Sequence, residues 1–306
     1  MGPERLVLAD VGATGNPKGV WREAREYCSF ILFDPDPRAS LQSPDQHSSV
    51  YPVGLWSSSV TRTLSLAANP EASSVFEFND EFFQDFLNAP LHKVMGRETV
   101  VLDSMENVLG SSGQLPDFIK VDAEGADLEI LRGAETYLRQ GCLGVFIEVS
   151  FVERHKGAPY FSERNMYMRA HNFHVMDLYL ERWVRANNVS RLFSRHQLIW
   201  GDALYVVNRQ EFLRRLRMTE PGRRKGLVAK FLLILLLYQH HDYAEEIIDH
   251  SHAEGLITDE EAIVAKQVVD SAMANGPANL ARLAVSIILS SVGVILLMPA
   301  RVFVAG

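Results

Sequence analysis

The chain has 306 residues, 47% of them hydrophobic and 22% charged, and its formal net charge at pH 7 is −8. This composition is that of a folded globular protein and excludes an intrinsically disordered chain, which would be poorer in hydrophobic residues. The negative net charge argues against a general nucleic-acid binder, because binding to phosphates needs a basic surface. The length predicts one large domain together with a smaller second unit.

The cysteines and the amino terminus predict the cellular compartment. The sequence contains two cysteines, Cys28 and Cys142, and both stand in apolar runs that favour small buried side chains. The start of the chain lacks the basic residues, long apolar run and small-residue cleavage site of a secretory signal. We therefore expect a reducing compartment and a cytoplasmic location.

The beginning of the chain predicts one β-α-β unit. Residues 6–9 are an apolar run that leads directly into a glycine turn over residues 10–15. A helix is expected over residues 18–26, and a second strand over residues 29–33 ends before two prolines. A glycine turn after the first strand and an acid after the second place a nucleoside across the carboxyl edge of a parallel sheet.

The middle of the chain continues the alternation of strands and helices. Residues 127–139 carry apolar residues at the spacing of an amphipathic helix, and the Ser/Thr-rich stretch before Leu66 predicts a loop or an edge hairpin. The pattern predicts a doubly wound α/β fold with a Rossmann-like, mostly parallel sheet and an antiparallel edge strand. Further strands are expected at residues 51–56, 117–122, 144–149, 173–177 and 202–207.

Carboxylates and glycines of the first unit predict a nucleoside site. Gly12 and Gly15 let the backbone approach a ligand, and Asp10 at the strand end can accept hydrogen bonds. Asp34 follows the second strand, where a carboxylate can accept hydrogen bonds from both ribose hydroxyls.

The same layout could bind NAD, so the two nucleoside cofactors have to be distinguished. Residues 12–15 look like the start of the glycine motif of short-chain dehydrogenases and sugar epimerases, but Lys18 stands where that motif has a further glycine. No tyrosine is followed four residues later by the lysine that those enzymes need. An NAD-dependent sugar-modifying enzyme is therefore the disfavoured alternative.

Residues 117–134, followed by residues 146–149, closely resemble the signature of the FkbM family of methyltransferases. That signature is a strand-to-helix turn with a Lys-x-Asp-x-Glu-Gly core, then Leu-x-Gly-Ala, then a strand with Ile-Glu-Val. The resemblance covers about residues 5–208 and implies an S-adenosylmethionine-dependent methyltransferase, with O-methylation of a sugar, glycan or other hydroxylated metabolite. One departure is Asn16, which occupies the position of the later glycine of the family's turn.

The resemblance also implies roles for individual residues. Asp10, Gly12 and Ala13 should line the amino-acid end of the cofactor, and Asp34 should hold its ribose. The complete set of expected cofactor-binding residues is Asp10, Gly12, Ala13, Gly15, Asp34 and Asp36.

Four residues are candidates for catalysis. Asp122 and Glu124 should lie at the carboxyl end of the central strand and position the acceptor, with Glu148 and His155 as further candidates. Two structural alternatives remain open: Asp122 as the cap of the helix near Gly125, and His155 as a solvated loop residue. Paired carboxylates can bind a divalent metal, but no third ligand is visible, so no metal is predicted.

The chain changes character after residue 208, which predicts a helical region over residues 209–306. A basic and then apolar stretch lies at 214–238, and an apolar segment at 283–300 is at the lower limit for crossing a bilayer. These two segments are compatible with contact with the inner face of a membrane, as a peripheral or tail-anchored protein. A helix buried in a homodimer explains the same composition. A catalytically inactive binding or scaffold protein remains the alternative function, because of Asn16.

Overall fold

The computed structural model describes residues 5–13, 17, 19–36, 38, 41, 43, 45–187 and 193–275. The chain divides into two compact units, one formed by Arg5–Arg215 and one that begins at Leu216. The first unit thus extends past residue 208, the expected boundary, into helix α7 (Arg209–Met218).

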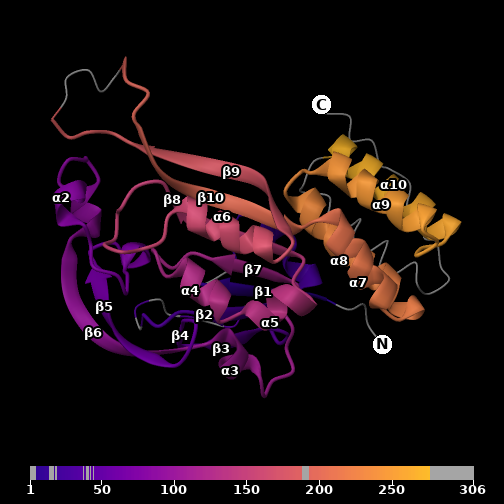
Figure 1. Ribbon diagram of the computed structural model, residues 1–306, viewed down its shortest axis with the longest axis horizontal. Coiled ribbons are helices and arrows are strands. Elements are labelled where there is room, and N and C mark those ends of the chain that lie inside the picture. Colours follow the sequence, from indigo (N-terminus) through magenta and orange to yellow (C-terminus); the bar gives the residue numbers. More distant parts are fainter. Residues whose placement is uncertain are drawn as a thin grey trace, which may run out of the picture. The chain divides into compact units, whose positions relative to one another are not determined.

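The first unit contains a seven-stranded sheet with the order β3-β2-β1-β7-β8-β10-β9 (Figure 1). Strands β3, β2, β1, β7 and β8 are parallel, whereas β10 is antiparallel to both of its neighbours. The antiparallel strand therefore lies one place inside the sheet edge that β9 forms. The strands are β1 (Leu6–Val11), β2 (Cys28–Phe33), β3 (Ser49–Tyr51), β7 (Phe118–Val121), β8 (Gly144–Ser150), β9 (Phe173–Trp183) and β10 (Gln197–Val207). This is the predicted doubly wound α/β fold.

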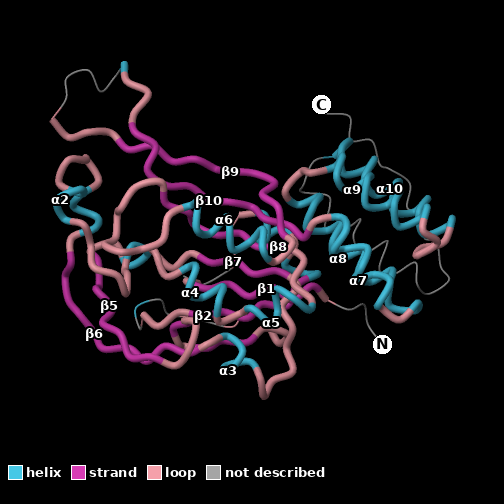
Figure 2. The backbone as a smooth tube through the Cα atoms, in the orientation of Figure 1, coloured by secondary structure: helices cyan, strands magenta, loops and turns pink. Residues whose placement is uncertain are grey.

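The direction of the strand order reverses between β1 and β7. Because crossovers between parallel strands are right-handed, helices that follow β1 and β7 pack on opposite faces of the sheet. Trp21 after β1 packs on Phe118 with ring centroids 4.7 Å apart, and α4, α5 and α6 lie together on one face (Figure 2). These helices are α1 (Val20–Glu23), the 3-10 helix η1 (Arg25–Tyr27), α4 (Asp127–Arg132), α5 (Glu135–Gln140) and α6 (Phe161–Ala170).

The helix expected over residues 127–139 is interrupted, so that prediction was wrong in one respect. Gly133 separates α4 from α5, and a Cβ atom there would lie 2.0 Å from the carbonyl oxygen of Trp56. The helix is therefore interrupted at a position that only glycine can occupy, because the backbone of Trp56 lies so close to it.

A second, three-stranded sheet has the order β4-β6-β5 and was not predicted. It consists of β4 (Gly54–Leu55), β5 (Val60–Ala67) and β6 (Val94–Asp103). The single strand expected at residues 51–56 is divided between the two sheets, because Pro52 cannot donate to a ladder. The stretch before Leu66, expected as a loop or an edge hairpin, is the edge strand β5, which pairs antiparallel with β6.

Short helices and an aromatic cluster complete the first unit. Phe78, Phe83, Phe86 and Trp183 pack in a core that Ala67, Ala72 and Ile199 extend. Cys28 and Cys142 are buried and free, as the sequence predicts. The remaining short helices are η3 (Pro70–Ala72), α2 (Asp80–Phe83), η4 (Ala89–His92) and α3 (Met105–Leu109).

The second unit is helical over the residues that the structure describes. Helices α8 (Pro221–Leu237), α9 (His241–Ala253) and α10 (Asp259–Asn275) contact one another. Residues 228–237 of α8 are all buried, which makes them core rather than exposed surface. The basic residues before them are partly engaged within the protein, since Arg215 pairs with Glu211 and Arg217 with Glu254.

None of the described helices is long and apolar enough to cross a membrane. The segment 283–300 lies outside the described residues. Membrane contact through it or through residues 214–238 stays a prediction, as do the homodimer and the cytoplasmic location.

Candidate functional site

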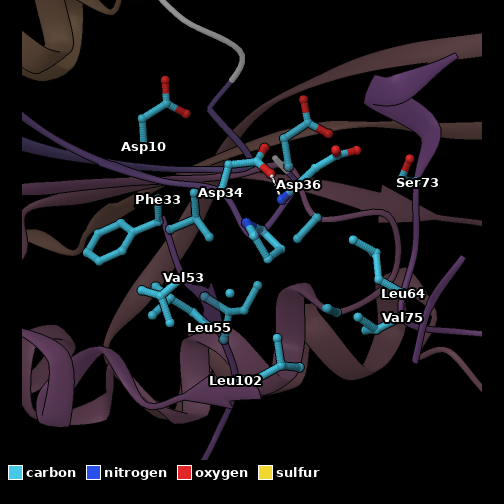
Figure 3. A pocket seen from close by; sticks show the side chains of 18 of the residues that line it. Asp10, Phe33, Asp34, Asp36, Val53, Leu55, Leu64, Ser73, Val75 and Leu102 are labelled. Carbon is cyan, nitrogen blue, oxygen red and sulfur yellow. Dashed lines mark hydrogen bonds between the residues drawn. The ribbon is translucent and has the colours of Figure 1, made fainter. Parts of the chain in front are cut away.

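A cavity lies at the carboxyl edge of the main sheet, where β1 and β7 end and the strand order reverses. Ligands of doubly wound sheets bind at this position. Asp10, Asp34 and Asp36 lie along one side of the cavity, and apolar side chains line the other (Figure 3). The apolar side is formed largely by the second sheet and the segments around it, with Val53, Leu55, Leu64, Val75 and Leu102.

The turn after β1 brings backbone to the cavity. Gly12 has a φ of +79°, and a Cβ atom there would lie 1.9 Å from the carbonyl oxygen of Asp122. The backbone N–H groups of Gly12 and Ala13 both donate to the carbonyl oxygen of Phe33, at 2.9 and 3.1 Å. The turn is therefore fixed against the ends of β2 and β7 and admits only glycine at position 12. Gly15 lies outside the described residues.

A lysine stands between two of the predicted acidic residues. Lys120 of β7 lies in register with Asp10 of β1, and its Nζ is 2.9 Å from Asp10 Oδ1 and 3.9 Å from Asp122 Oδ2. Asp10 is buried, whereas the Asp122 side chain is 48% exposed. Burial alone would lower the pKa of Lys120, but the negative charges of Asp10 and Asp122 outweigh this effect and raise it.

Asp34 and Asp36 lie side by side after β2 but differ in their partners. Asp36 accepts bidentate hydrogen bonds from the guanidinium of Arg38, which also donates to Ser73 Oγ at 2.9 Å. Asp34 accepts a 2.7 Å hydrogen bond from the backbone N–H of Asp36, and burial raises its pKa to about 6. Asp34 thus has more capacity for a ligand, while Asp36 fixes the loop through Arg38.

Glu124 and Glu148 are joined by a buried arginine. Arg154 contacts Glu148 through one guanidinium nitrogen and Glu124 through another, the latter at 3.2 Å. Burial raises the pKa of Glu124 to about 7 and that of Glu148 well above its usual value. One cation therefore faces two carboxyl groups whose charged forms are disfavoured by burial, so the two groups titrate together.

The turn between β7 and α4 is held by a second buried ion pair. The Asp127 carboxylate accepts hydrogen bonds from the backbone N–H groups of Ala123 and Gly125, at 3.2 and 3.1 Å. Arg164 of α6 donates to the same carboxylate at 3.0 Å, and both side chains are fully buried. The alternative in which Asp122 caps this helix is wrong, because Ala126 is the N-cap residue of α4 and no side chain caps it.

His155 is buried, which overturns the alternative of a solvated loop histidine. Its ring packs edge-on against Phe78 at 5.0 Å and is 2% exposed. Its Nε2 lies 4.0 Å from Glu124 Oε2. Burial lowers the pKa of His155 well below its usual value and that of His92, which stacks on Phe83, to about 4. Both histidines are therefore neutral at pH 7.

The predicted residues fall into two groups in space. Asp10, Gly12, Asp34, Asp36 and Asp122 line the cavity. The second group consists of buried residues that are absent from the described lining of the cavity. These are Ala13, in the turn after β1, and Glu124, Glu148 and His155, around Arg154. Among the described residues, no three His, Cys, Asp or Glu side chains are placed to hold a metal ion.

Three charged residues of the site were not predicted. Lys120 could have been found, because a lysine within an apolar strand of a central sheet is unusual. Arg154 stands in a loop without a recognisable pattern. Asp202 lies opposite Glu148 in the strand pairing, and burial with the charge of Asp122 raises its pKa to about 7.

Comparisons with known proteins identify one family. The family model described as "Methyltransferase FkbM domain" matches residues 14–175, which is more than half of the chain. A search of curated proteins found no match.

Among solved structures, the chain is similar to the crystal structure of methyltransferase FkbM from Methylobacillus flagellatus KT. The two share 12% sequence identity with a TM-score of 0.35, over 66% of this chain and 43% of that one. The chain thus matches less than half the length of that protein.

Proposed function

We propose, since the chain belongs to the FkbM methyltransferase family, that it is an S-adenosylmethionine-dependent methyltransferase that acts on a hydroxyl group of a sugar, glycan or other hydroxylated metabolite. The acceptor class follows the family resemblance. The observation that carries the proposal is the cavity at the reversal of the strand order, with the Gly12 turn at one end and Asp34 beside it.

The residues of the cavity fit the three parts of this cofactor. Asp34 offers carboxylate oxygens to ribose hydroxyls, and apolar side chains such as Leu55 and Leu102 offer a surface to the adenine ring. Asp10 and the Gly12 turn face the amino-acid part. Aspartates outnumber cationic side chains in the described lining, which suits a ligand with a sulfonium and an ammonium group.

When bound, S-adenosylmethionine supplies an electrophilic methyl group. The chain's own residues then have to align the acceptor oxygen and receive its proton. Asp122 is the one predicted catalytic residue in the described lining, and its half-exposed carboxylate is available to orient an acceptor hydroxyl. The same carboxylate is the candidate for receiving the hydroxyl proton.

Glu124, Glu148 and His155 receive a supporting role in this proposal. Arg154 ties Glu124 to Glu148, and His155 packs beside Glu124. We infer that this cluster fixes the turn that carries Asp122, and that these residues do not contact the acceptor.

Calorimetric titration tests the cofactor assignment. Purified protein should bind S-adenosylmethionine and S-adenosylhomocysteine at micromolar concentration and should not bind NADH. Asp34→Ala should weaken binding of both adenosyl ligands about 10- to 100-fold, the usual effect of losing hydrogen bonds to a charged group. Asp80→Ala, at an exposed position of α2, is the matched control and should bind normally.

The transfer itself is tested by incubating the protein with methyl-labelled S-adenosylmethionine and a panel of sugars, glycans and other hydroxylated compounds. Label should appear on a hydroxyl oxygen, and Asp122→Asn should reduce turnover more than it reduces cofactor binding. Folded protein that binds neither adenosyl ligand would refute the proposal and favour a scaffold role.

A further inference from the structure

Lys120 occupies an unusual place in the sheet. It lies in β7 between β1 and β8, where strands covered on both faces normally carry apolar side chains. Its side chain is 22% exposed and reaches the cavity. Among the described residues that line the cavity, it is the one with a cationic side chain.

The hydrogen bonds of Lys120 leave capacity for a ligand. An ammonium group has three N–H donors, and Asp10 accepts one of them at 2.9 Å. Asp122 lies at 3.9 Å, beyond hydrogen-bond distance. No other acceptor for Lys120 is found in the part of the chain that the structure describes. The remaining N–H donors of this charged ammonium can therefore bind an anionic group in the cavity.

The position of Lys120 relative to Asp10 suggests which anion. A carboxylate and an ammonium group stand 2.9 Å apart at the cavity end that the Gly12 turn borders. An amino acid carries the complementary pair on one carbon atom, its ammonium and its carboxylate. We propose that Lys120 binds the α-carboxylate of the cofactor's methionine part, while Asp10 accepts a hydrogen bond from the neighbouring α-ammonium.

This assignment rests on the proposed function and extends it to a residue that sets specificity for the complete amino-acid group. It predicts that the site distinguishes S-adenosylmethionine from its decarboxylated analogue, which keeps the adenosine, the sulfonium and the ammonium. A purely structural Lys120, which only neutralises Asp10, Asp122 and Asp202, predicts no such discrimination.

The test is a ligand-by-variant titration. Wild-type protein, Lys120→Met and Lys93→Met are titrated with S-adenosylmethionine, decarboxylated S-adenosylmethionine and 5′-methylthioadenosine, which lacks the amino-acid group. Lys93 is exposed and outside the described lining, so its variant is the matched control. Wild type and the control should bind S-adenosylmethionine at least 10-fold more tightly than the decarboxylated analogue. Lys120→Met should lose about 10- to 100-fold in affinity for the former and less than 2-fold for the latter.

Equal losses for both ligands, or no loss for either, would overturn the assignment. If Lys120→Met does not fold, the wild-type comparison still decides, because equal affinity for the two ligands excludes recognition of the carboxylate. Lys120→Arg, which keeps the charge, should retain part of the discrimination. If wild-type protein binds none of the three ligands, the proposed function itself fails. If it binds 5′-methylthioadenosine without distinguishing the other two, only the role of Lys120 fails.

Discussion

Gly12 shows how one residue without a side chain shapes the site. Gly12→Ala would place a methyl group against the carbonyl oxygen of Asp122 and would force a left-handed backbone on alanine. We expect a loss of about 1–2 kcal/mol from the backbone alone, a further loss from the displaced turn, and abolished binding of adenosyl ligands. Urea unfolding and calorimetry measure the two effects. All four tryptophans lie in the first unit, so their fluorescence reports its unfolding.

Gly113→Ala is the control for this prediction. Gly113 has a similar φ of +69°, but a Cβ atom there would meet nothing within 4 Å. Gly113→Ala should therefore destabilise the protein only through backbone strain and should leave ligand binding intact. Equal effects of the two substitutions on binding would contradict the role of the Gly12 turn.

Arg154 is the residue on which the buried carboxyl groups depend. Arg154→Met should destabilise the first unit by about 3–5 kcal/mol, because it leaves Glu124 and Glu148 buried without a counter-charge. The loss should be larger at pH 8 than at pH 5, where the two carboxyl groups are neutralised by protons. Arg185→Met removes an exposed ion pair with Asp85 and should cost about 0–1 kcal/mol. Similar losses of stability in Arg154→Met and Arg185→Met would contradict the claim that the buried carboxyl groups depend on Arg154.

At the scale of elements, one carboxylate joins the turn after β7 to helix α6. Asp127→Ala removes the acceptor for two backbone N–H groups and leaves Arg164 buried without a counter-charge. We expect a loss of about 3–5 kcal/mol in the free energy of unfolding, measured by urea denaturation. Asp127→Asn should lose less, since its amide oxygen still accepts hydrogen bonds. A cost below about 1 kcal/mol for the alanine variant would show that α6 holds the turn without Asp127.

The strands of the two sheets differ in how readily their sequences reveal them. Strands β1, β2, β7 and β8 are mostly buried, so they read as continuous apolar runs. Strand β6 has a largely exposed, charged sequence and was not predicted. Its partner β5 was expected only as a loop or an edge hairpin. The wall of the cavity opposite the aspartates therefore comes from elements with weak patterns.

For the first unit as a whole, raised carboxyl pKa values predict how stability depends on pH. Burial raises the pKa of Asp34 to about 6, and the pKa values of Glu124 and Asp202 to about 7. The folded state therefore binds protons more tightly than the unfolded chain, whose carboxyl groups titrate near pH 4. The stabilisation from these carboxyl groups is complete below pH 4 and is lost as the pH rises through about 6 to 7. The lowered pKa values of His92 and His155 act in the opposite direction below about pH 6.5, so the carboxyl contribution is isolated by comparing variants between pH 5 and pH 8.

Urea unfolding followed by tryptophan fluorescence at several pH values measures this effect. Glu124 alone should contribute a decrease of about 3 kcal/mol, and Glu124→Gln should flatten the pH dependence. Glu153→Gln, at an exposed position, should leave the dependence unchanged. A Glu124→Gln variant with the same pH dependence as the wild type would contradict the assignment of a buried, protonated carboxyl group.

The sequence by itself determined the fold class and one group of residues at the candidate site. Apolar runs that end in glycine or acidic residues predicted β1, β2 and the turn between β1 and its helix. Because that information is local, Asp10, Gly12 and Asp34 could be assigned before the structure was known, and all three line the cavity.

The tertiary structure decided which charged residues act together. Arg154 meets Glu124 across 30 residues of sequence, and Lys120 meets Asp10 across 110. The same folding separated Glu124, Glu148 and His155 from the described lining of the cavity and left Asp122 in it. Such pairings are not local. The burial of a charge and the identity of its partner depend on how distant strands and loops pack, and no spacing along the chain encodes them.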